Sequence, residues 1–421
     1  RGDLRTAVVE LLASFAVYRT YVAVGRDPEP EDRDEVAAAI ERAGAWDVDA
    51  DLLGFLGELL LLERPGEPET AFALGFQQLC AAVAAKGVED TAFYRFVRLC
   101  SLDEVGCDPA LFGTSPARFH EFAAGVAAIR PTAMLTLETH DTKRSADVRA
   151  RLNALSEQPA AWRSLLAELD EASAPYRPAL LDRTTEYLVA QTLVGAWPIP
   201  VERAVEYVRK ATKEAKVATS WDRPNEAYDT AVEGFVRTAL ADERYVEAVE
   251  AFLAATDLVA HGRRNSLAQL ALLLTAPGVP DLYQGTELWQ LALVDPDNRR
   301  PVDFARRAAL LDELAGEGPP RVSLADDEEG RTKLWLTATL LTHRREHPER
   351  YRSSSYAALE ASGPAADRVV AFARDGLVTC VPRLAVPADG LDSTLLALPP
   401  GGWRDLLTGA HRDGEVAVAT L

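Results

Sequence analysis

The feature that most constrains the fold is the stretch 133–157, in which a short apolar run changes abruptly into a charged helix. The run Met134–Thr139 is brief, rich in threonine and preceded by Pro131, so it predicts a buried strand rather than a helix. From Ser145 onward, apolar residues recur at helical spacing with charged residues between them. Residues 140–144 therefore lie where a strand ends and a helix begins. In α/β proteins, binding and catalytic residues collect at that end of a strand.

A second stretch, "APGVPDLYQGTELWQLALVDPDNRRPVDF", has the same organisation. A short strand, 279–283, ends in Tyr283 and Gly285, and a loop rich in aspartate and arginine follows, including Asp297 and Arg300. Aromatic faces beside forked guanidinium groups and carboxylates suit a polyhydroxylated ring. The same residues equally fit an aromatic core closed by a salt-bridged turn.

Long helical segments separate these strands. Helices are predicted around 4–15, 35–43, 50–62, 68–86 and 91–99, throughout 145–260, and over the stretch "GRTKLWLTATLLTHRREH", with a further strand at 17–24. A helix ending near Thr275 is predicted to be capped by Asn265 or Ser266. After Tyr351, alternating apolar and polar runs separated by glycine, proline and aspartate predict a small antiparallel β domain.

This pattern predicts an α/β fold: the second half of a (β/α)8 TIM-type barrel with large helical insertions, followed by the antiparallel β domain. The barrel portion would cover 1–350, with insertions at about 28–130 and 160–260, and the β domain would cover 351–421. Three predicted strands are too few to close a barrel of eight. The chain also opens at Arg1 inside a predicted helix and has one methionine, so we expect a piece of a longer protein.

Composition narrows the class of partner. The net charge of −20 argues against nucleic acid and against an anionic membrane. The most apolar segment, starting at Ser266, is too short to span a membrane and is broken by Pro277. The six histidines are scattered and the four cysteines form no CxxC pair, so we expect neither a metal site nor a disulfide framework, and we expect a cytoplasmic location.

Asp141 is the first candidate for chemistry. A carboxylate at a strand's carboxyl end, beside His140, could stabilise positive charge that develops at the anomeric carbon of a sugar. The alternative is that Asp141 caps the following helix. By the same reasoning, His140 could be a packed, hydrogen-bonded histidine, and the cations Lys143, Arg144, Arg149 and Arg151 could form a solvated helix face.

A third motif is "AAKGVEDTAFYRFVRL". Lys86 and Gly87 are predicted to close one helix, and Asp90 and Thr91 to open the next with capping chemistry. Phe93, Tyr94 and Arg95 would then project from the first turn of that next helix. Spacing alone indicates only a corner between two helices.

Together, the motifs "AAKGVEDTAFYR", "THDTKRSADVRARLNALSE" and "PGVPDLYQGTELWQLALVDPDNRRPVDF", supported by "VYRTYV" and "ATLLTHRREHPERY", are more specific than any one of them. In this order along nearly the whole chain, they resemble the maltooligosyltrehalose synthase family, carboxyl-terminal portion, within the α-amylase-like glycoside hydrolases. The resemblance implies an isomerase of trehalose biosynthesis, a (1→4)-α-D-glucan 1-α-D-glucosylmutase. Such an enzyme moves the reducing-end glucose of a maltooligosaccharide from an α-1,4 to an α,α-1,1 linkage by a retaining mechanism, without a cofactor.

The resemblance also implies roles for single residues. Asp141 would be the transition-state stabiliser, with His140 as a substrate-binding histidine beside it. Further substrate contacts would come from Lys143, Arg144, Tyr283, Asp297 and Arg300, and reducing-end contacts from Lys86, Phe93, Tyr94 and Arg95. A trehalose-releasing hydrolase of the same pathway would be the functional partner.

The nucleophile and the acid/base of the family have no counterpart motif in this sequence. A retaining glycosidase needs both groups, so we expect the chain to be inactive alone. Two alternatives remain: another amylase-family α-glucan hydrolase or transglycosylase, and a non-catalytic carbohydrate-binding protein.

Overall fold

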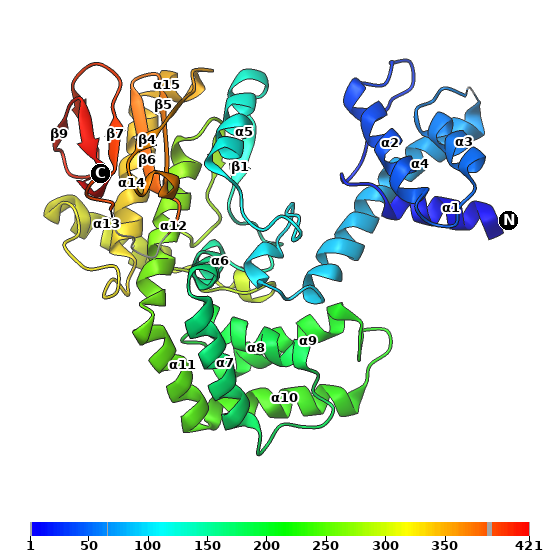
Figure 1. Ribbon diagram of the computed structural model, residues 1–421, viewed down its shortest axis with the longest axis horizontal. Helices are drawn as coiled ribbons and strands as arrows, with labels where there is room; N and C mark the ends of the chain where they lie inside the picture. Colours follow the sequence, from blue (N-terminus) through cyan, green and yellow to red (C-terminus); the bar gives the residue numbers. More distant parts are fainter. Residues whose placement is uncertain (1, 65, 385–389, 421) are drawn as a thin grey trace. The chain divides into compact units, whose positions relative to one another are not determined.

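The structure is a computed structural model that describes residues 2–64, 66–384 and 390–420. The chain divides into two compact units (Figure 1). One unit comprises residues 1–95 and 214–217, and the other comprises residues 96–213 and 218–421. The predicted boundary between residues 350 and 351 is a different division and stays a prediction.

The first unit is built from helices around one apolar core. The helices are α1 (Gly2–Ala13), α2 (Pro30–Ala43), α3 (Ala50–Leu60) and α4 (Glu67–Val83). Leu11, Val36, Leu56 and Phe76, one from each helix, are buried together in that core. The four helices predicted over this part of the sequence are therefore confirmed, with ends that shift by a few residues.

The predicted strand at 17–24 is wrong, although all of its residues are described. Its backbone is bonded to side chains instead of to a neighbouring strand. The amide of Tyr21 donates to Asp32 Oδ1 at 2.9 Å, and Gln77 Nε2 donates to the carbonyl of Val22 at 3.0 Å. An extended segment becomes a strand only when another backbone lies beside it.

The helix predicted at 91–99 is also wrong. After α4 the chain forms a π-helical turn (Ala84–Glu89) and a single 3₁₀ turn (Ala92–Tyr94). The next backbone groups bond to Gln191, whose side chain accepts from the amide of Cys100 at 2.9 Å and donates to the carbonyl of Val97 at 2.8 Å. This glutamine is fully buried and takes the place of helical hydrogen bonds.

The run Glu67–Tyr94 is long and apolar enough to cross a membrane by length and composition alone. One such helix is weak evidence, because a core helix of a soluble protein passes the same test. Within the unit, Phe76 and Cys80 of this run pack into the core. The expectation of no membrane partner stays a prediction.

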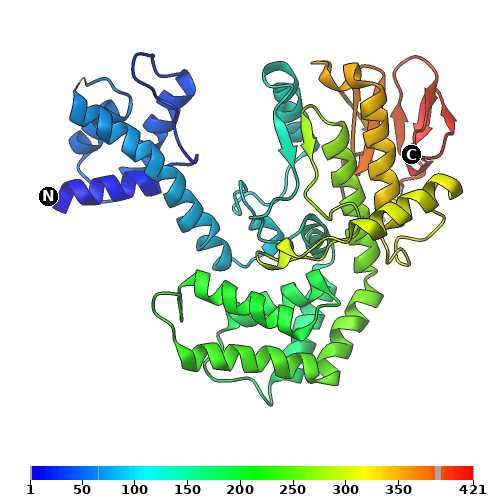
Figure 2. The same cartoon turned by 180° about the vertical axis from the view of Figure 1, so that it is seen from behind.

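In the second unit, two strands form a parallel pair (Figure 2): β1 (Met134–Thr136) and β2 (Val279–Asp281). Met134 lies opposite Val279 in the register of the pair. Parallel strands need a long connection between them. That connection is helical: α6 (Ala146–Asn153), α7 (Pro159–Ser173), α8 (Arg183–Ala196), α9 (Val201–Ala215), α10 (Glu226–Ala241), α11 (Glu243–Ala255) and α12 (Leu258–Thr275). Helix α5 (Pro116–Ile129) precedes β1.

Helix α12 is the central support of this unit. It begins at Leu258, so the predicted cap at Asn265 or Ser266 is wrong, while its predicted end at Thr275 is confirmed. Leu270, Leu273 and Leu274 pack against helix α14 (Arg331–Glu346) and against the β1 strand. Helices α13 (Phe304–Glu317) and α15 (Pro348–Arg352) lie on either side of α14 in the sequence.

The last part of the chain forms small antiparallel sheets, as expected for the residues after Tyr351. The strands are β3 (Ala357–Leu359), β4 (Ala361–Ser362), β5 (Val369–Arg374), β6 (Leu377–Pro382), β7 (Leu395–Ala397), β8 (Trp403–Arg404), β9 (His411–Arg412) and β10 (Glu415–Ala417). They pair in the orders β3-β5-β6, β10-β7-β4 and β8-β9. Val370 and Val381 pack against Ala268, which joins this layer to α12. The protein is thus helix-rich, with small antiparallel sheets at its end.

Candidate active site

The predicted strand-to-helix turn at 140–144 is confirmed, but the strand before it ends at Thr136 and, with Met134 73% exposed, it is not the buried strand that was predicted. The carboxyl ends of β1 and β2 lie at the same edge because the two strands are parallel and in register. His140 and Asp141 follow β1, and Tyr283 follows β2. Helix α6 begins after Ser145, whose Oγ accepts the amide of Val148 at 3.3 Å.

The Asp141 carboxylate is exposed and does not cap the helix. Its side chain is 52% exposed, and Ser145 holds the capping position. The nearest cation is Lys143, with Nζ 4.0 Å from Asp141 Oδ1 and a side chain only 2% exposed. The capping alternative for Asp141 is therefore wrong, and this carboxylate is open to a ligand with a buried ammonium beside it.

The His140 backbone is held by the loop that follows β2. Asn298, which is buried in the 3₁₀ turn Asp297–Arg299, donates from Nδ2 to the carbonyl of His140 at 3.0 Å. The carbonyl of Asn298 in turn accepts from the Tyr283 hydroxyl at 3.1 Å. The His140 side chain itself is exposed, so the alternative of a packed histidine is wrong.

Glu104 fixes the other side of the turn. Its carboxylate accepts the amide of Lys143 at 2.8 and 3.0 Å and the amide of Arg144 at 3.2 Å. The Arg144 guanidinium is buried and donates to the carbonyl of Cys100 at 3.1 Å and to the Tyr207 hydroxyl at 2.5 Å. The alternative of a solvated cationic face is therefore wrong for Lys143 and Arg144.

Arg149 and Arg151 are not part of a solvated face either. Arg149 donates to the carbonyl of Leu137, and Arg151 is buried and donates to the carbonyl of Trp197 at 2.7 Å. Because the Arg144 guanidinium is buried, it is better placed to support the turn than to contact a sugar. Its predicted substrate contact stays a prediction.

A buried ion pair ties the beginning of α6 to α14. Lys333 Nζ donates to Asp147 Oδ1 at 2.9 Å, to Asp147 Oδ2 at 2.8 Å and to the carbonyl of Leu288 at 3.2 Å. The same carboxylate accepts the amide of Gln290 at 2.7 Å and the hydroxyl of Ser266. Asp147 thus joins the turn, α12, α14 and the loop after β2. Sequence reasoning missed this role, although Asp147 lies within the motif.

The Asp297 carboxylate is held by Arg203 of α9. Arg203 donates from Nε at 2.8 Å and from a second guanidinium nitrogen at 2.7 Å, in a bidentate pair. Asp297 also accepts the amide of Leu293 at 2.7 Å. The Arg300 side chain is more than half exposed, and its Nε lies 3.1 Å from Asp297 Oδ1. The salt-bridged turn is therefore present, and Arg300 is the more accessible of the two predicted contacts.

The predicted reducing-end cluster lies in the first unit. Lys86 is exposed and paired with Asp90, and Arg95 donates from Nε to the carbonyl of Ala215 at 2.6 Å. Phe93 and Tyr94 are buried. Their predicted contact with the reducing end of the substrate stays a prediction.

Two buried carboxyl groups near the turn have strongly raised pKa values. Burial raises the pKa of Asp103 to about 8, against the lowering effect of Arg144. Burial also raises the pKa of Glu138 to about 7, although Glu138 accepts the amide of Ala146 at 2.9 Å. Glu138 lines a cavity of about 20 Å³, room for about one water molecule, together with Tyr283.

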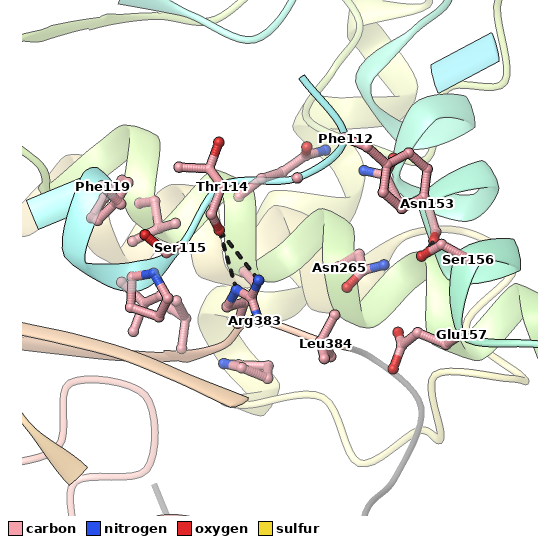
Figure 3. Close-up of a pocket in the computed structure, with 18 of the residues that line it drawn as sticks. Phe112, Thr114, Ser115, Phe119, Asn153, Ser156, Glu157, Asn265, Arg383 and Leu384 are labelled. Atoms are coloured by element: carbon pink, nitrogen blue, oxygen red, sulfur yellow. Dashed lines mark hydrogen bonds between the residues drawn. The ribbon is translucent and has the colours of Figure 1, made fainter. Parts of the chain in front are cut away.

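A larger cavity of about 380 Å³ lies elsewhere in the second unit (Figure 3). Phe112, Asn153 and Asn265 line it, and Arg383 donates to the carbonyl of Thr114 at its edge. None of the residues predicted to bind sugar lines this cavity. Among the described residues, no group of three or more His, Cys, Asp or Glu side chains is placed to hold a metal ion.

Comparison with known proteins identifies relatives. A curated protein of Mycobacterium tuberculosis named "Putative maltooligosyl trehalose synthase" is 41% identical over 85% of this chain, and the match covers 45% of that protein. The solved maltooligosyltrehalose synthase of Arthrobacter ramosus is 40% identical with a TM-score of 0.88, and the match covers 100% of this chain and 53% of that one.

A solved structure described as a "hypothetical maltooligosyl trehalose synthase" of Sulfolobus tokodaii is 28% identical with a TM-score of 0.76, over 97% of this chain and 52% of that one. No model of a protein family matches the chain. The chain spans about half the length of the relatives it matches.

Proposed function

We propose that this chain, a homologue of maltooligosyltrehalose synthases over 85% of its length, is a carboxyl-terminal portion of such an enzyme. The complete enzyme would be an intramolecular transglycosylase. It would cleave the last α-1,4 bond at the reducing end of a maltooligosaccharide and rejoin the released glucose to the same donor as an α,α-1,1 bond. Its product would pass to a trehalose-releasing hydrolase, and both reactions would take place in the cytoplasm.

One observation carries this proposal: the Asp141 carboxylate is exposed at the carboxyl end of a parallel strand, and the turn beneath it is fixed on two sides. Glu104 holds the amides that follow Asp141, and Asn298 holds the carbonyl that precedes it. A rigidly held carboxylate can stabilise an oxocarbenium-like transition state without reorganising when the charge develops.

The parallel pair β1 and β2 would be the seventh and eighth strands of a (β/α)8 barrel. In such barrels, the active site lies at the carboxyl ends of the strands, which is where His140, Asp141 and Tyr283 are found here. The residues of this chain would provide the third carboxylate and sugar contacts. The nucleophile and the acid/base would come from the part of the enzyme that has no counterpart in this chain.

The reaction requires that water be excluded while the glycosyl-enzyme waits for the released glucose to turn. The helical segment α7–α11 follows helix α6, which begins at the turn that bears Asp141, and it would contribute to that enclosure. Lys143, with its ammonium buried beside Asp141, would orient a sugar hydroxyl.

The test is a chimera in which this chain replaces the matching half of the Arthrobacter ramosus synthase. With maltohexaose, we expect reducing ends to disappear without an equal release of glucose, and we expect Asp141→Asn to lower that rate by at least 10³-fold. Ser164→Ala, an exposed substitution on α7, is the matched control and should leave the rate unchanged.

All three chimeras must unfold cooperatively at the same temperature for the comparison to count. Equal rates for the Asp141→Asn and parent chimeras would refute the role of Asp141. Release of new reducing ends in place of their loss would refute the synthase assignment and favour an α-glucan hydrolase. The isolated chain should show neither activity.

A further inference from the structure

The second unit contains a cavity of about 500 Å³ between its helices and its antiparallel strands. Leu336 and Leu340 of α14 form one wall, and strands β6, β8 and β9 contribute the other walls. The α14 helix and the antiparallel strands lie next to each other in both views (Figures 1 and 2). The volume is in the range of pockets that bind small molecules. None of the residues predicted to bind glucan lines this cavity.

An indole and a guanidinium form a wall of the cavity together. Trp403 of β8 and Arg412 of β9 are directly opposite in the antiparallel pair, so their side chains project from the same face. Trp403 Nε1 donates to the carbonyl of Pro399 at 2.8 Å, which fixes the indole. Arg412 donates to the carbonyl of Thr420 at 2.8 Å, but its Nε is buried without a partner among the described residues.

A second buried polar atom lacks a partner in the same cavity. Thr379 of β6 is 6% exposed, and its Oγ1 has no hydrogen-bond partner in the described part of the chain. Thr379 shares a strand face with Val381, which packs against α12, so its side chain points toward the helices that line the cavity. A buried hydroxyl is costly to leave unbonded. An arginine Nε can only donate and a threonine hydroxyl can donate, so each of the two atoms fits a ligand that carries a hydrogen-bond acceptor.

The charge of the cavity differs from that of the chain. The protein has 65 acidic against 45 basic residues, yet three arginines line this cavity: Arg350, Arg404 and Arg412. The hydrogen bonds described for Arg350 and Arg412 go to backbone carbonyls. Arg350 donates to the carbonyl of Gly376 at 2.9 Å, and Arg412 donates to that of Thr420. Elsewhere arginines such as Arg203 pair with carboxylates.

One carboxylate, that of Asp405, also lines the cavity. It is occupied by its own turn, because it accepts the amide of Leu407 at 2.8 Å and the hydroxyl of Thr408. The cavity therefore combines an apolar wall, a flat indole and an excess of guanidinium groups. Guanidinium groups bind phosphate by paired hydrogen bonds, and an indole offers a face on which a sugar ring or a base can stack.

We propose that this cavity binds a small phosphorylated metabolite with a sugar or nucleoside body. The phosphoryl oxygens would accept from Arg412 Nε, from the Thr379 hydroxyl and from Arg350, and the body would lie against Trp403 and the leucines of α14. The site is separate from the proposed glucan site and does not depend on the function proposed above.

The test is isothermal titration calorimetry on the full chain at constant ionic strength. The probes are glucose 6-phosphate, adenosine monophosphate, inorganic phosphate and maltose. We expect one of the two organic phosphates to bind with a micromolar Kd. Which of the two binds identifies the body as sugar or nucleoside. We expect inorganic phosphate and maltose to bind at least 30-fold more weakly.

Two variants test the assigned atoms. Arg412→Gln should weaken binding of that phosphate at least 10-fold. Thr379→Val should weaken it at least 3-fold without lowering the thermal midpoint, because it removes a hydroxyl that has no hydrogen-bond partner among the described residues. Arg163→Gln, on the exposed surface of α7, is the matched control and should not change the Kd.

Absence of binding by both organic phosphates would overturn the proposal. If inorganic phosphate binds as tightly as the organic phosphates, the cavity does not recognise the sugar or nucleoside part of the ligand. If maltose binds equally well, the cavity does not recognise the charge of the phosphate. Either result would overturn the proposal. Unchanged affinity in both Arg412→Gln and Thr379→Val would move the site elsewhere and overturn it too.

Discussion

Replacing Lys333 by methionine should destabilise the second unit by about 3–5 kcal/mol, the usual cost of leaving a buried charge without its partner. The structure gives the reason. Lys333 and Asp147 are 4% and 6% exposed, and the ammonium uses three donors, on both carboxylate oxygens and on the carbonyl of Leu288. After the replacement, Asp147 keeps the amide of Gln290 and the hydroxyl of Ser266 but loses the cation that is hydrogen-bonded to it.

The double variant Lys333→Met, Asp147→Asn removes both charges, so it should be more stable than the sum of the single effects by about 2 kcal/mol. The measurement is urea unfolding followed by tryptophan fluorescence, for which Trp289 is a local reporter because Lys333 Nζ lies 5.6 Å from its ring. Lys86→Met is the control: its ion pair is exposed, so we expect a change below about 0.5 kcal/mol.

A loss of stability below about 1 kcal/mol for Lys333→Met would refute the reasoning, because removing one partner of a buried ion pair must cost more than removing one partner of an exposed pair. Additive effects in the double variant would refute it as well, since they would show that the two groups do not stabilise each other.

Three further predictions concern the turn and its supports. Asp103 has a pKa raised to about 8, so the native state binds its proton more tightly than the unfolded state. Its contribution to stability should be fully present below about pH 4 and fall by about 1 kcal/mol per pH unit toward pH 7. In urea titrations at several pH values, Asp103→Asn should remove this contribution and leave the smaller slope of the same sign that Glu138, with a pKa raised to about 7, produces. Ser145→Ala should lower the free energy of unfolding by about 1–2 kcal/mol because it removes the helix cap. Asp141→Ala should change it by less than about 0.5 kcal/mol, because the exposed Asp141 does not cap the helix. Equal losses in the two variants would contradict the assignment of the cap. Arg203→Lys should lower the free energy of unfolding by about 1–2 kcal/mol, because it replaces the bidentate contact to Asp297 with a single one. Amide hydrogen exchange should then accelerate in the loop after β2. Unchanged exchange in that loop would refute the supporting role of Arg203.

Local patterns in the sequence predicted much of the secondary structure. The strand-to-helix turn at 140–144, the end of α12 at Thr275 and the antiparallel strands after Tyr351 all follow from hydrophobic periodicity and turn residues. The strand at 17–24 failed because a strand depends on a neighbour that periodicity does not reveal. The helix at 91–99 failed because the Gln191 side chain bonds the backbone there.

In the candidate site too, residues within local motifs were predicted from the sequence, and residues that act through distant contacts were not. His140, Asp141 and Tyr283 were predicted because each lies within a recognisable motif. Glu104 and Arg203 were missed because their partners lie 39 and 94 positions away in the sequence. No local pattern indicates such contacts, and each of the two residues reads as an ordinary charged side chain in its own segment.

The pairing of β1 with β2 has a consequence for the order of folding. The Ser145 hydroxyl donates to the carbonyl of Gln290, 145 positions away, at 2.5 Å. Closing a flexible loop of that length costs about 4 kcal/mol in chain entropy, so this contact forms readily only after the helices between its ends have folded and drawn them together. During synthesis, the segment bearing Asp141 leaves the ribosome well before β2 does. The turn is thus synthesised early, and it becomes rigid only late, when the loop after β2 forms its hydrogen bonds to it.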